Sequence, residues 1–184
     1  MANSDIKRGL VPVRFASGQP YNGASNKYYV PASNAAALFE GDPVMLTGDA
    51  DANGIAGVVI SGGSAAILGT IVGFVPTPTR SNLGYIPANT EGYVLVADAS
   101  ELECEIQTSA AITAADIGQN AGFAMTAGDT VYRRSNVQLD QGSIAATATL
   151  PLQILGEVQR IDNEPFTAAS KLRVRINSNA SAGV

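Results

Sequence analysis

Three glutamates at alternate positions have the residue type and spacing that could form a catalytic carboxylate group. Glu101, Glu103 and Glu105 belong to the run Glu-Leu-Glu-Cys-Glu-Ile. Side chains alternate between the two faces of a β-strand, so the three carboxylates would share one face. Paired carboxylates hydrolyse glycosides, but such sites need a cleft, usually with aromatic platforms. The chain contains no Trp and no His, which also removes His-based triads and His-containing zinc sites. We therefore predict a charged strand face.

A second candidate for chemistry is a cation-binding loop. The run Asp49-Ala50-Asp51-Ala52-Asn53-Gly54 matches the start of a calcium loop, in which oxygens at alternate positions surround a hard cation. The twelfth position would be Ile60, where a helix–loop–helix site needs a bidentate Glu. Asp-x-Asn-Gly is also an ordinary hairpin turn. We favour the turn and keep Asp49, Asp51 and Asn53 as the alternative metal candidate.

Signatures of other enzyme classes are absent from the sequence. The chain has no Gly-x-Ser-x-Gly turn, no phosphate loop ending in Gly-Lys-Ser/Thr, and no dinucleotide fingerprint that opens a helix. Cys104 is the single cysteine, so an intramolecular disulfide is excluded, and its place on the apolar side of a strand predicts a buried side chain. We expect a protein that is not an enzyme and that needs no cofactor.

The strand that carries the glutamates has a counterpart of opposite charge near the C-terminus. Lys171-Leu172-Arg173-Val174-Arg175-Ile176 shows the same strict alternation as residues 101–106. The apolar members of both runs should point into a core, and the charged members should form an acidic row and a basic row that face outward. The two rows either pair within one sheet or meet between subunits.

The rest of the chain also predicts β-structure. Further strands are expected at residues 44–47, 55–60, 66–75, 92–97, 122–126, 129–132 and 145–155. Residues 52–79 carry no charge, but Ser61-Gly62-Gly63-Ser64 interrupts them, so we predict two buried strands and no membrane-spanning segment. One short helix is expected at 113–118. The predicted fold is all-β, a β-sandwich or β-barrel (jelly-roll-like), with at most one short helix.

The sequence predicts an extended N-terminal arm at residues 1–34 and a single β domain at residues 35–184. Pro12 opposes pairing in a central strand, and turn-forming residues follow at 17–24. Three tyrosines lie within nine residues, and tyrosine is favoured in interfaces. We therefore expect the arm to contact a partner and to be mobile in the free protein; the alternative is that it packs on its own domain.

Charge is distributed unevenly along the chain. Residues 1–39 carry four basic residues against Asp5, residues 40–132 carry Arg80 against eleven acidic residues, and residues 133–184 carry six basic residues against four acidic ones. This pattern is typical either of contact between copies or with a charged partner, or of ordinary surface solvation. The acidic middle opposes direct binding of nucleic acid. The predicted interface residues are Lys7, Arg8, Arg14, Tyr21, Lys27, Tyr28, Tyr29, Arg80, Glu101, Glu103, Glu105, Arg133, Arg134, Lys171, Arg173 and Arg175.

Several segments resemble a family of tailed-bacteriophage head proteins that accompany the major capsid protein. They occur in order over most of the chain: Gly9-Leu10-Val11-Pro12-Val13-Arg14, residues 20–33 (Pro-Tyr-Asn-Gly-Ala-Ser-Asn-Lys-Tyr-Tyr-Val-Pro-Ala-Ser), Leu38-Phe39-Glu40-Gly41-Asp42-Pro43-Val44, Ile71-Val72-Gly73-Phe74, and residues 154–160 with 162–164. The resemblance implies a capsid cement, or decoration, protein, and it implies no active-site residues.

This resemblance carries expectations about partners and location. Such a protein would bind the outer surface of a shell made of phage major capsid protein with the HK97-type fold. It would do so as a homo-oligomer, a trimer or dimer at symmetry axes, after synthesis in the cytoplasm of the host bacterium. The alternative function is a head-surface module that binds glycans or other host material.

Overall fold

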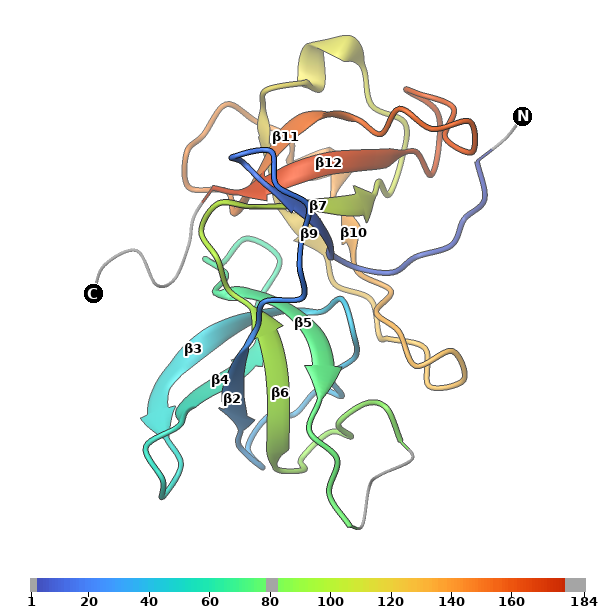
Figure 1. Ribbon diagram of the computed structural model, residues 1–184. Helices are drawn as coiled ribbons and strands as arrows, with labels where there is room; N and C mark the ends of the chain where they lie inside the picture. The colour runs from blue at the N-terminus through green and yellow to red at the C-terminus, as the bar shows by residue number, and fades with distance from the viewer. Residues whose placement is uncertain (1–2, 79–82, 178–184) are drawn as a thin grey trace.

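The computed structural model describes residues 3–78 and 83–177, and this part of the chain is all-β, as predicted. The strands form two units that lie one above the other in Figure 1: a five-stranded sheet and a closed five-stranded barrel. The helical elements of the described residues are two 3-10 turns, η1 (Ala114–Asp116) and η2 (Gln141–Ser143). The sequence predicted only the first of these turns.

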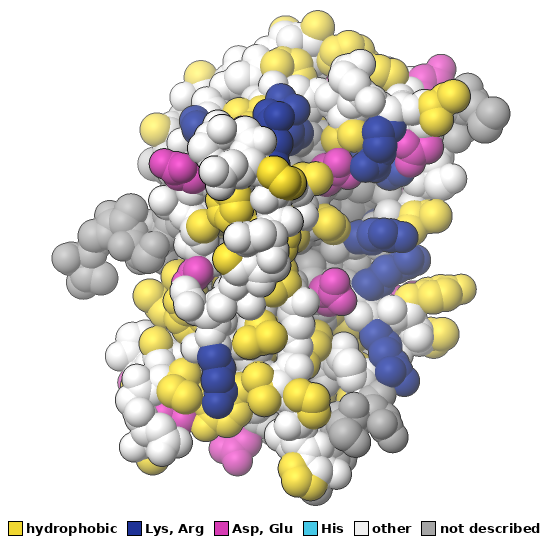
Figure 2. Space-filling view, viewed as in Figure 1, with side chains coloured by type: hydrophobic (Ala, Val, Ile, Leu, Met, Phe, Trp, Pro, Cys, Tyr) yellow, Lys and Arg dark blue, Asp and Glu magenta, His cyan; other side chains and the backbone are white. Residues whose placement is uncertain are grey.

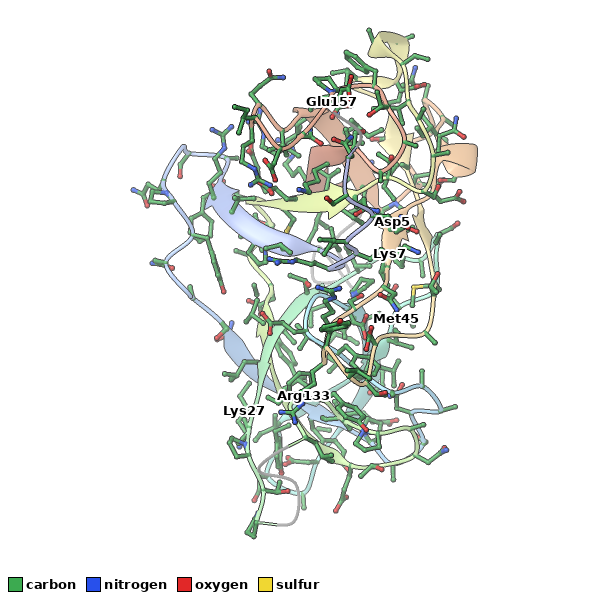
Figure 3. The ribbon with its side chains drawn as sticks, turned by 90° about the vertical axis from the view of Figure 1, so that its right-hand side faces the viewer. Asp5, Lys7, Lys27, Met45, Arg133 and Glu157 are labelled. Atoms are coloured by element: carbon green, nitrogen blue, oxygen red, sulfur yellow. The ribbon has the colours of Figure 1, made fainter. Side chains whose placement is uncertain are left out.

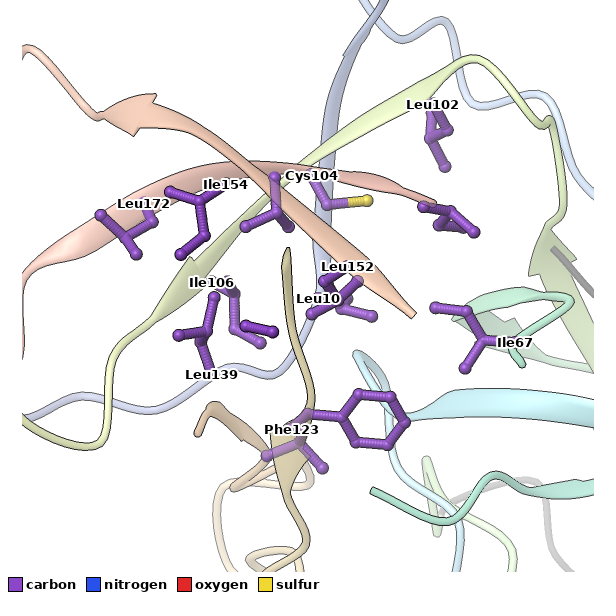
Figure 4. Packing of buried hydrophobic residues seen from close by; sticks show 14 of the residues in the cluster. Leu10, Ile67, Leu102, Cys104, Ile106, Phe123, Leu139, Leu152, Ile154 and Leu172 are labelled. Atoms are coloured by element: carbon purple, nitrogen blue, oxygen red, sulfur yellow. The ribbon is translucent and has the colours of Figure 1, made fainter. Parts of the chain in front are cut away.

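The sheet combines strands from distant parts of the chain, and all its neighbours are antiparallel. Their order is β1 (Val11–Phe15), β7 (Leu102–Gln107), β12 (Lys171–Ile176), β11 (Leu152–Glu157) and β8 (Asn120–Ala121). The apolar side chains that alternate along β7 and β12 are all buried on one face, which confirms that prediction. A two-stranded ribbon, β9 (Phe123–Ala124) and β10 (Gln138–Leu139), packs Phe123 and Leu139 into the same core (Figure 4).

Cys104 lies within this core and is buried, as the sequence predicted. Burial raises the pKa of its thiol to about 12, because the thiolate would lose its hydration. At neutral pH this side chain is therefore protonated and acts as a small apolar group.

The barrel is made of the five strands that lie between β1 and β7 in the chain. They run around it in the order β2 (Asn26–Val30), β4 (Ala56–Ile60), β3 (Pro43–Ala50), β5 (Gly69–Phe74) and β6 (Gly92–Ala97). A parallel contact of Tyr29 with Gly57 and an antiparallel pairing of β2 with β6 complete the closure. The uncharged stretch 52–79 contains the two predicted strands, β4 and β5, which flank β3. Within the described residues, no helix has the length and apolar character needed to span a bilayer.

Buried hydrogen bonds join the barrel to the sheet just before β1. The N–H of Leu10 donates to the carbonyl of Gly41 at 2.8 Å, and the Thr70 hydroxyl donates to the carbonyl of Leu10 at 2.9 Å. Gly9 and Gly41 have φ angles of 65° and 92°, and a Cβ at either would lie about 2 Å from a backbone oxygen of the facing segment. Only glycine allows the two backbones to approach this closely.

Most of the predicted N-terminal arm belongs to the two units. β1 pairs with β7 at the edge of the sheet, where Pro12 is tolerated because an edge strand can leave one side unpaired. β2 is a strand of the closed barrel. The predicted boundary at residue 34 therefore does not separate an arm from a single domain. Residues 3–10 of the predicted arm precede the first strand and belong to no sheet.

The prediction of a strand at residues 129–132 differs from the structure. Residues 129–132 do not form a strand; they begin a turn that is closed by backbone hydrogen bonds between Asp129 and Arg134. The turn forms because the Asp129 carboxylate accepts from the N–H groups of Val131 and Tyr132, which a strand would direct to a neighbour. The closed barrel corresponds to the β-barrel alternative of the predicted fold, and a five-stranded sheet lies beside it.

Amide hydrogen exchange can test the place of β2 in the fold. We expect residues 26–30 to exchange as slowly as residues 92–97, because β2 and β6 are hydrogen-bonded neighbours in the barrel. Residues 4–8, which belong to no sheet, should exchange faster and serve as the internal reference. Equal and fast exchange of residues 4–8 and 26–30 in the free protein would contradict this structure and favour a mobile arm.

Candidate functional site

The acidic and basic rows lie next to each other in one sheet. β7 and β12 are antiparallel neighbours, with Glu105 opposite Arg173 and Glu103 opposite Arg175. Of the two arrangements that the sequence left open, the structure has the pairing within one chain. We refer to the side of β1, β7 and β12 that carries these charges as the outer face.

Glu103 is held between two arginines and is nearly buried. Its carboxylate accepts a hydrogen bond of 2.7 Å from Nε of Arg14, which lies opposite it on β1. Nε of Arg173 lies 3.2 Å from the same oxygen, without the alignment of a hydrogen bond. Only 7% of Glu103 is exposed, although the sequence predicted an outward, solvated side chain. The guanidinium groups of the neighbouring strands cover it, and this neighbourhood is not visible in the local sequence.

Glu105 belongs to a second set of alternating charges. Arg160 pairs with Glu105 at 2.9 Å and with Asp162 at 3.1 Å, and Lys171 pairs with Asp162 at 2.8 Å. Hydrogen bonds from Lys171 and Arg160 lower the pKa of the Asp162 carboxyl. Arg160 and Asp162 come from the loop after β11, and neither was predicted to be part of a site. In the sequence they are two charged residues within one of the segments on which the resemblance rests.

The glutamates do not converge on a shared reaction centre. Glu101 lies in the exposed turn before β7, whereas Glu103 and Glu105 are paired with different arginines. The acidic groups that form ion pairs on the outer face are Glu103, Glu105 and Asp162. The basic groups there are more numerous: Arg14, Arg160, Lys171, Arg173 and Arg175. The outer face therefore keeps an excess of positive charge, and Arg175 donates to the neutral Gln153 at 2.7 Å.

The candidate calcium loop is a hairpin turn between β3 and β4. Oδ1 of Asp51 accepts from the N–H groups of Asn53 and Ile55, and Oδ2 accepts from the Tyr93 hydroxyl at 2.7 Å. Hydrogen bonds, the largest effect being that from Tyr93, lower the pKa of Asp51 to about 2. Its oxygens thus stabilise the turn, as favoured from the sequence. In the part of the chain that the structure describes, three or more His, Cys, Asp or Glu side chains do not gather into a metal site.

The three predicted interface tyrosines all contact their own chain. The hydroxyl of Tyr21 donates to the carbonyl of Ala24, and that of Tyr28 donates to Asp98 at 2.6 Å. Tyr29 packs its ring on Tyr93, and the Lys27 ammonium lies 4.0 Å from the centre of the Tyr93 ring. These contacts correspond to the self-packing alternative, and a role of the tyrosines in an interface stays a prediction.

Three of the predicted arginines meet at a groove of about 310 Å³ between β1 and the 129–134 loop. Its lining includes Arg8, Arg133 and Arg134, together with Ile71 and Val72 of β5. We call this the arginine groove. Figure 3 looks onto this side of the molecule, where Arg133 and Lys7 are labelled. In Figure 2 several Lys and Arg side chains lie one above another along this side, beside projecting hydrophobic ones.

Lys7 lies in a different groove, of about 530 Å³. This second groove is lined mainly by polar residues, among them Asn3, Asp5, Ser109, Gln138, Glu164 and Thr167. Asn3 fixes its rim, because its amide bonds with residues 164, 167 and 168. The predicted interface residues are thus divided among the outer face, the barrel wall and two grooves. Arg80 lies outside the described residues.

A buried carboxylate lies directly behind the arginine groove. Asp42 is 2% exposed, accepts from the Phe39 N–H at 2.7 Å, and is hydrogen-bonded by the Ser135 hydroxyl. Burial raises the pKa of Asp42 to about 6, against the opposing effect of these hydrogen bonds. In the sequence Asp42 was only part of a Glu-Gly-Asp-Pro turn, and its burial depends on a loop more than ninety residues later.

Comparison of the chain with protein-family models, curated proteins and solved structures gave no match in any of the three.

Replacement of Glu103 by Gln should destabilise the fold. The substitution removes the shared carboxylate and leaves Arg14 and Arg173 facing each other. We expect a loss of about 1–2 kcal/mol in the free energy of unfolding, because both arginines are partly hydrated. Glu101→Gln is the matched control and should have almost no effect, since Glu101 is in an exposed turn. Urea denaturation followed by circular dichroism measures both, and equal midpoints would contradict the proposed role of Glu103.

Asp42 should make stability fall as pH rises from about 4 to about 6. Its folded-state pKa of about 6 lies above the unfolded value of 3.8, so the folded protein holds the proton more tightly and is favoured at the lower pH. The expected change is about 2–3 kcal/mol, complete above pH 6. Asp42→Asn should abolish this slope, whereas Asp49→Asn, at an exposed position, should retain it. Denaturation at pH 4.5, 5.5 and 6.5 measures the slope, and its persistence in Asp42→Asn would assign it to another group.

Proposed function

We propose that this protein is a structural component of a bacteriophage head that binds the outer surface of the shell and stabilises it. The observation that carries the proposal is the ordered resemblance to tailed-phage head proteins. Three of the resembling segments, residues 9–14, 38–44 and 71–74, are far apart in sequence but contact one another where the barrel joins the sheet. The resemblance thus falls on residues that determine how the two units are joined.

The geometry supports a binding role in two ways. The barrel and the sheet have separate buried cores and are joined by buried hydrogen bonds, so their surfaces are held in a defined relation. The outer face and the arginine groove carry an excess of positive charge, although the whole chain has a net charge of −5. Charged patches of one sign guide encounter and orientation with a partner of the opposite sign.

The same proposal includes the finer expectations about assembly. The partners would be the major capsid protein with the HK97-type fold and further copies of this chain, as a trimer or dimer at a symmetry axis. Binding only to the assembled shell would stabilise that state by mass action, in proportion to the logarithm of the free protein concentration. The protein would act on the outside of the virion after synthesis in the host cytoplasm.

Heads assembled without this protein should gain thermal stability when it is added back. We expect the protein to co-sediment with such heads and to raise their melting temperature until the sites are saturated. Scanning calorimetry of heads with increasing protein measures the effect. Heads that already carry the full complement are the control and should not respond. Lack of both co-sedimentation and stabilisation would rule out the proposed function.

A second candidate function is glycan binding, for which the polar groove beside Asn3 is the specific observation. Its lining offers amide, hydroxyl and carboxylate groups that can hydrogen-bond to sugar hydroxyls. Saturable binding of a glycan by the free protein, lost in Gln138→Ala, would favour this candidate over the structural one.

A further inference from the structure

The 129–134 loop is a short, firmly held projection beside the arginine groove. Reciprocal backbone hydrogen bonds of 2.9 and 3.2 Å join Asp129 and Arg134 at its base. Oδ1 of Asp129 accepts from the N–H groups of Val131 and Tyr132 at 2.8 and 2.9 Å, so the tip is organised from within. A loop that is ordered before it binds loses less conformational entropy on binding.

The tip of this loop presents two large apolar side chains to solvent. Val131 is 80% exposed and Tyr132 is 68% exposed. The guanidinium of Arg134 lies 4.8 Å from the centre of the Tyr132 ring, which keeps the ring beside the groove. Arg133 has a φ of 56°, a left-handed conformation that is unfavourable for a residue with a side chain. Tyrosine and arginine are also the residue types enriched among interface residues that contribute most to binding.

The charges of the arginine groove have few partners within the chain. Among the described residues, Arg8, Arg133 and Arg134 form no ion pair, whereas Arg14, Arg160 and Arg173 on the outer face all do. Of the residues that the structure describes around the groove, Glu40 is the one with a carboxylate. The groove therefore has positive charge available for an external carboxylate, next to the partly exposed side chain of Val72.

We propose that the 129–134 loop and the arginine groove together form a docking surface for an acidic protein segment. Carboxylates of that segment would pair with Arg8, Arg133 and Arg134, and an apolar side chain between them would lie against Val131 and Tyr132. This inference rests on the proposed function, in which the segment belongs to the shell. Exposed apolar side chains and a net charge of −5 favour a protein partner over nucleic acid.

A matched pair of variants separates this surface from exposed apolar residues in general. Tyr132→Glu and Ile161→Glu each replace an exposed apolar side chain by a carboxylate, but Ile161 lies on the loop between β11 and β12. Binding to DNA-free heads assembled without the protein is measured by co-sedimentation. We expect Tyr132→Glu to weaken binding about ten-fold or more, and Ile161→Glu to change it less than about two-fold. Arg133→Glu should also weaken binding, through repulsion of the acidic segment.

The outcomes distinguish failure of the surface from failure of the function. If wild-type protein does not bind heads, the proposed function fails and this inference fails with it. If wild-type protein binds but Tyr132→Glu and Arg133→Glu bind equally well, only the inference is overturned. Circular dichroism checks that all variants are folded.

Sedimentation velocity and duplex-DNA titration of the free proteins test two other occupants of the surface. A Tyr132→Glu effect confined to self-association, or to DNA binding, would identify a second copy or nucleic acid as the occupant and overturn the acidic-segment proposal.

Discussion

The antiparallel pairing of β1 with β7 is the constraint on which the arrangement of this protein depends. The chain leaves the sheet after Phe15, forms the whole barrel, and returns at Leu102, which lies directly opposite Phe15. The barrel satisfies this constraint because its own first and last strands are neighbours, with Asn26 opposite Val96. Its entry and exit are therefore adjacent, and a closed unit with its own core can be inserted between paired strands without separating them.

The same pairing determines what the charged side chains do. β1 brings Arg14 to Glu103 on one side, and β12 brings Arg173 to it on the other. The acidic strand is thereby neutralised within the sheet, and the outer face becomes net positive although the middle of the sequence is strongly acidic. The net charge of a surface can be derived from the sequence only after the strand neighbours are known. A carboxylate that is shielded by two guanidinium groups no longer attracts a distant partner.

Local patterns predicted the elements that their own residues determine. Strict alternation was sufficient for β7, β12 and the burial of Cys104, since it depends only on the two-residue period of a strand. The Asp49–Gly54 turn was also predictable, because Asp51 bonds to backbone two and four residues later. Neighbours in the sheet, the insertion of the barrel and the burial of Asp42 were not predictable, because each depends on contacts between residues far apart in the chain. The sequence predicted a strand at 129–132 because Val and Tyr favour strands. In the structure, Asp129 accepts hydrogen bonds from the N–H groups of Val131 and Tyr132, and this local bonding forms a turn instead.

The 129–134 loop differs from the charged strands and from the contact between barrel and sheet, because its hydrogen bonds hold an exposed backbone. At those two places, hydrogen bonds and ion pairs accompany burial: Glu103 is covered by arginines, and Thr70 bonds to Leu10 where the barrel joins the sheet. In this loop, hydrogen bonds to Asp129 hold the backbone, but Val131 and Tyr132 remain exposed to water. Arg133 has a left-handed backbone conformation that costs of the order of 1–3 kcal/mol. Such a loop adds little to the stability of the isolated fold. Its exposed apolar area and positive charge become favourable only when another molecule covers them, which is the physical reason to place a docking surface there.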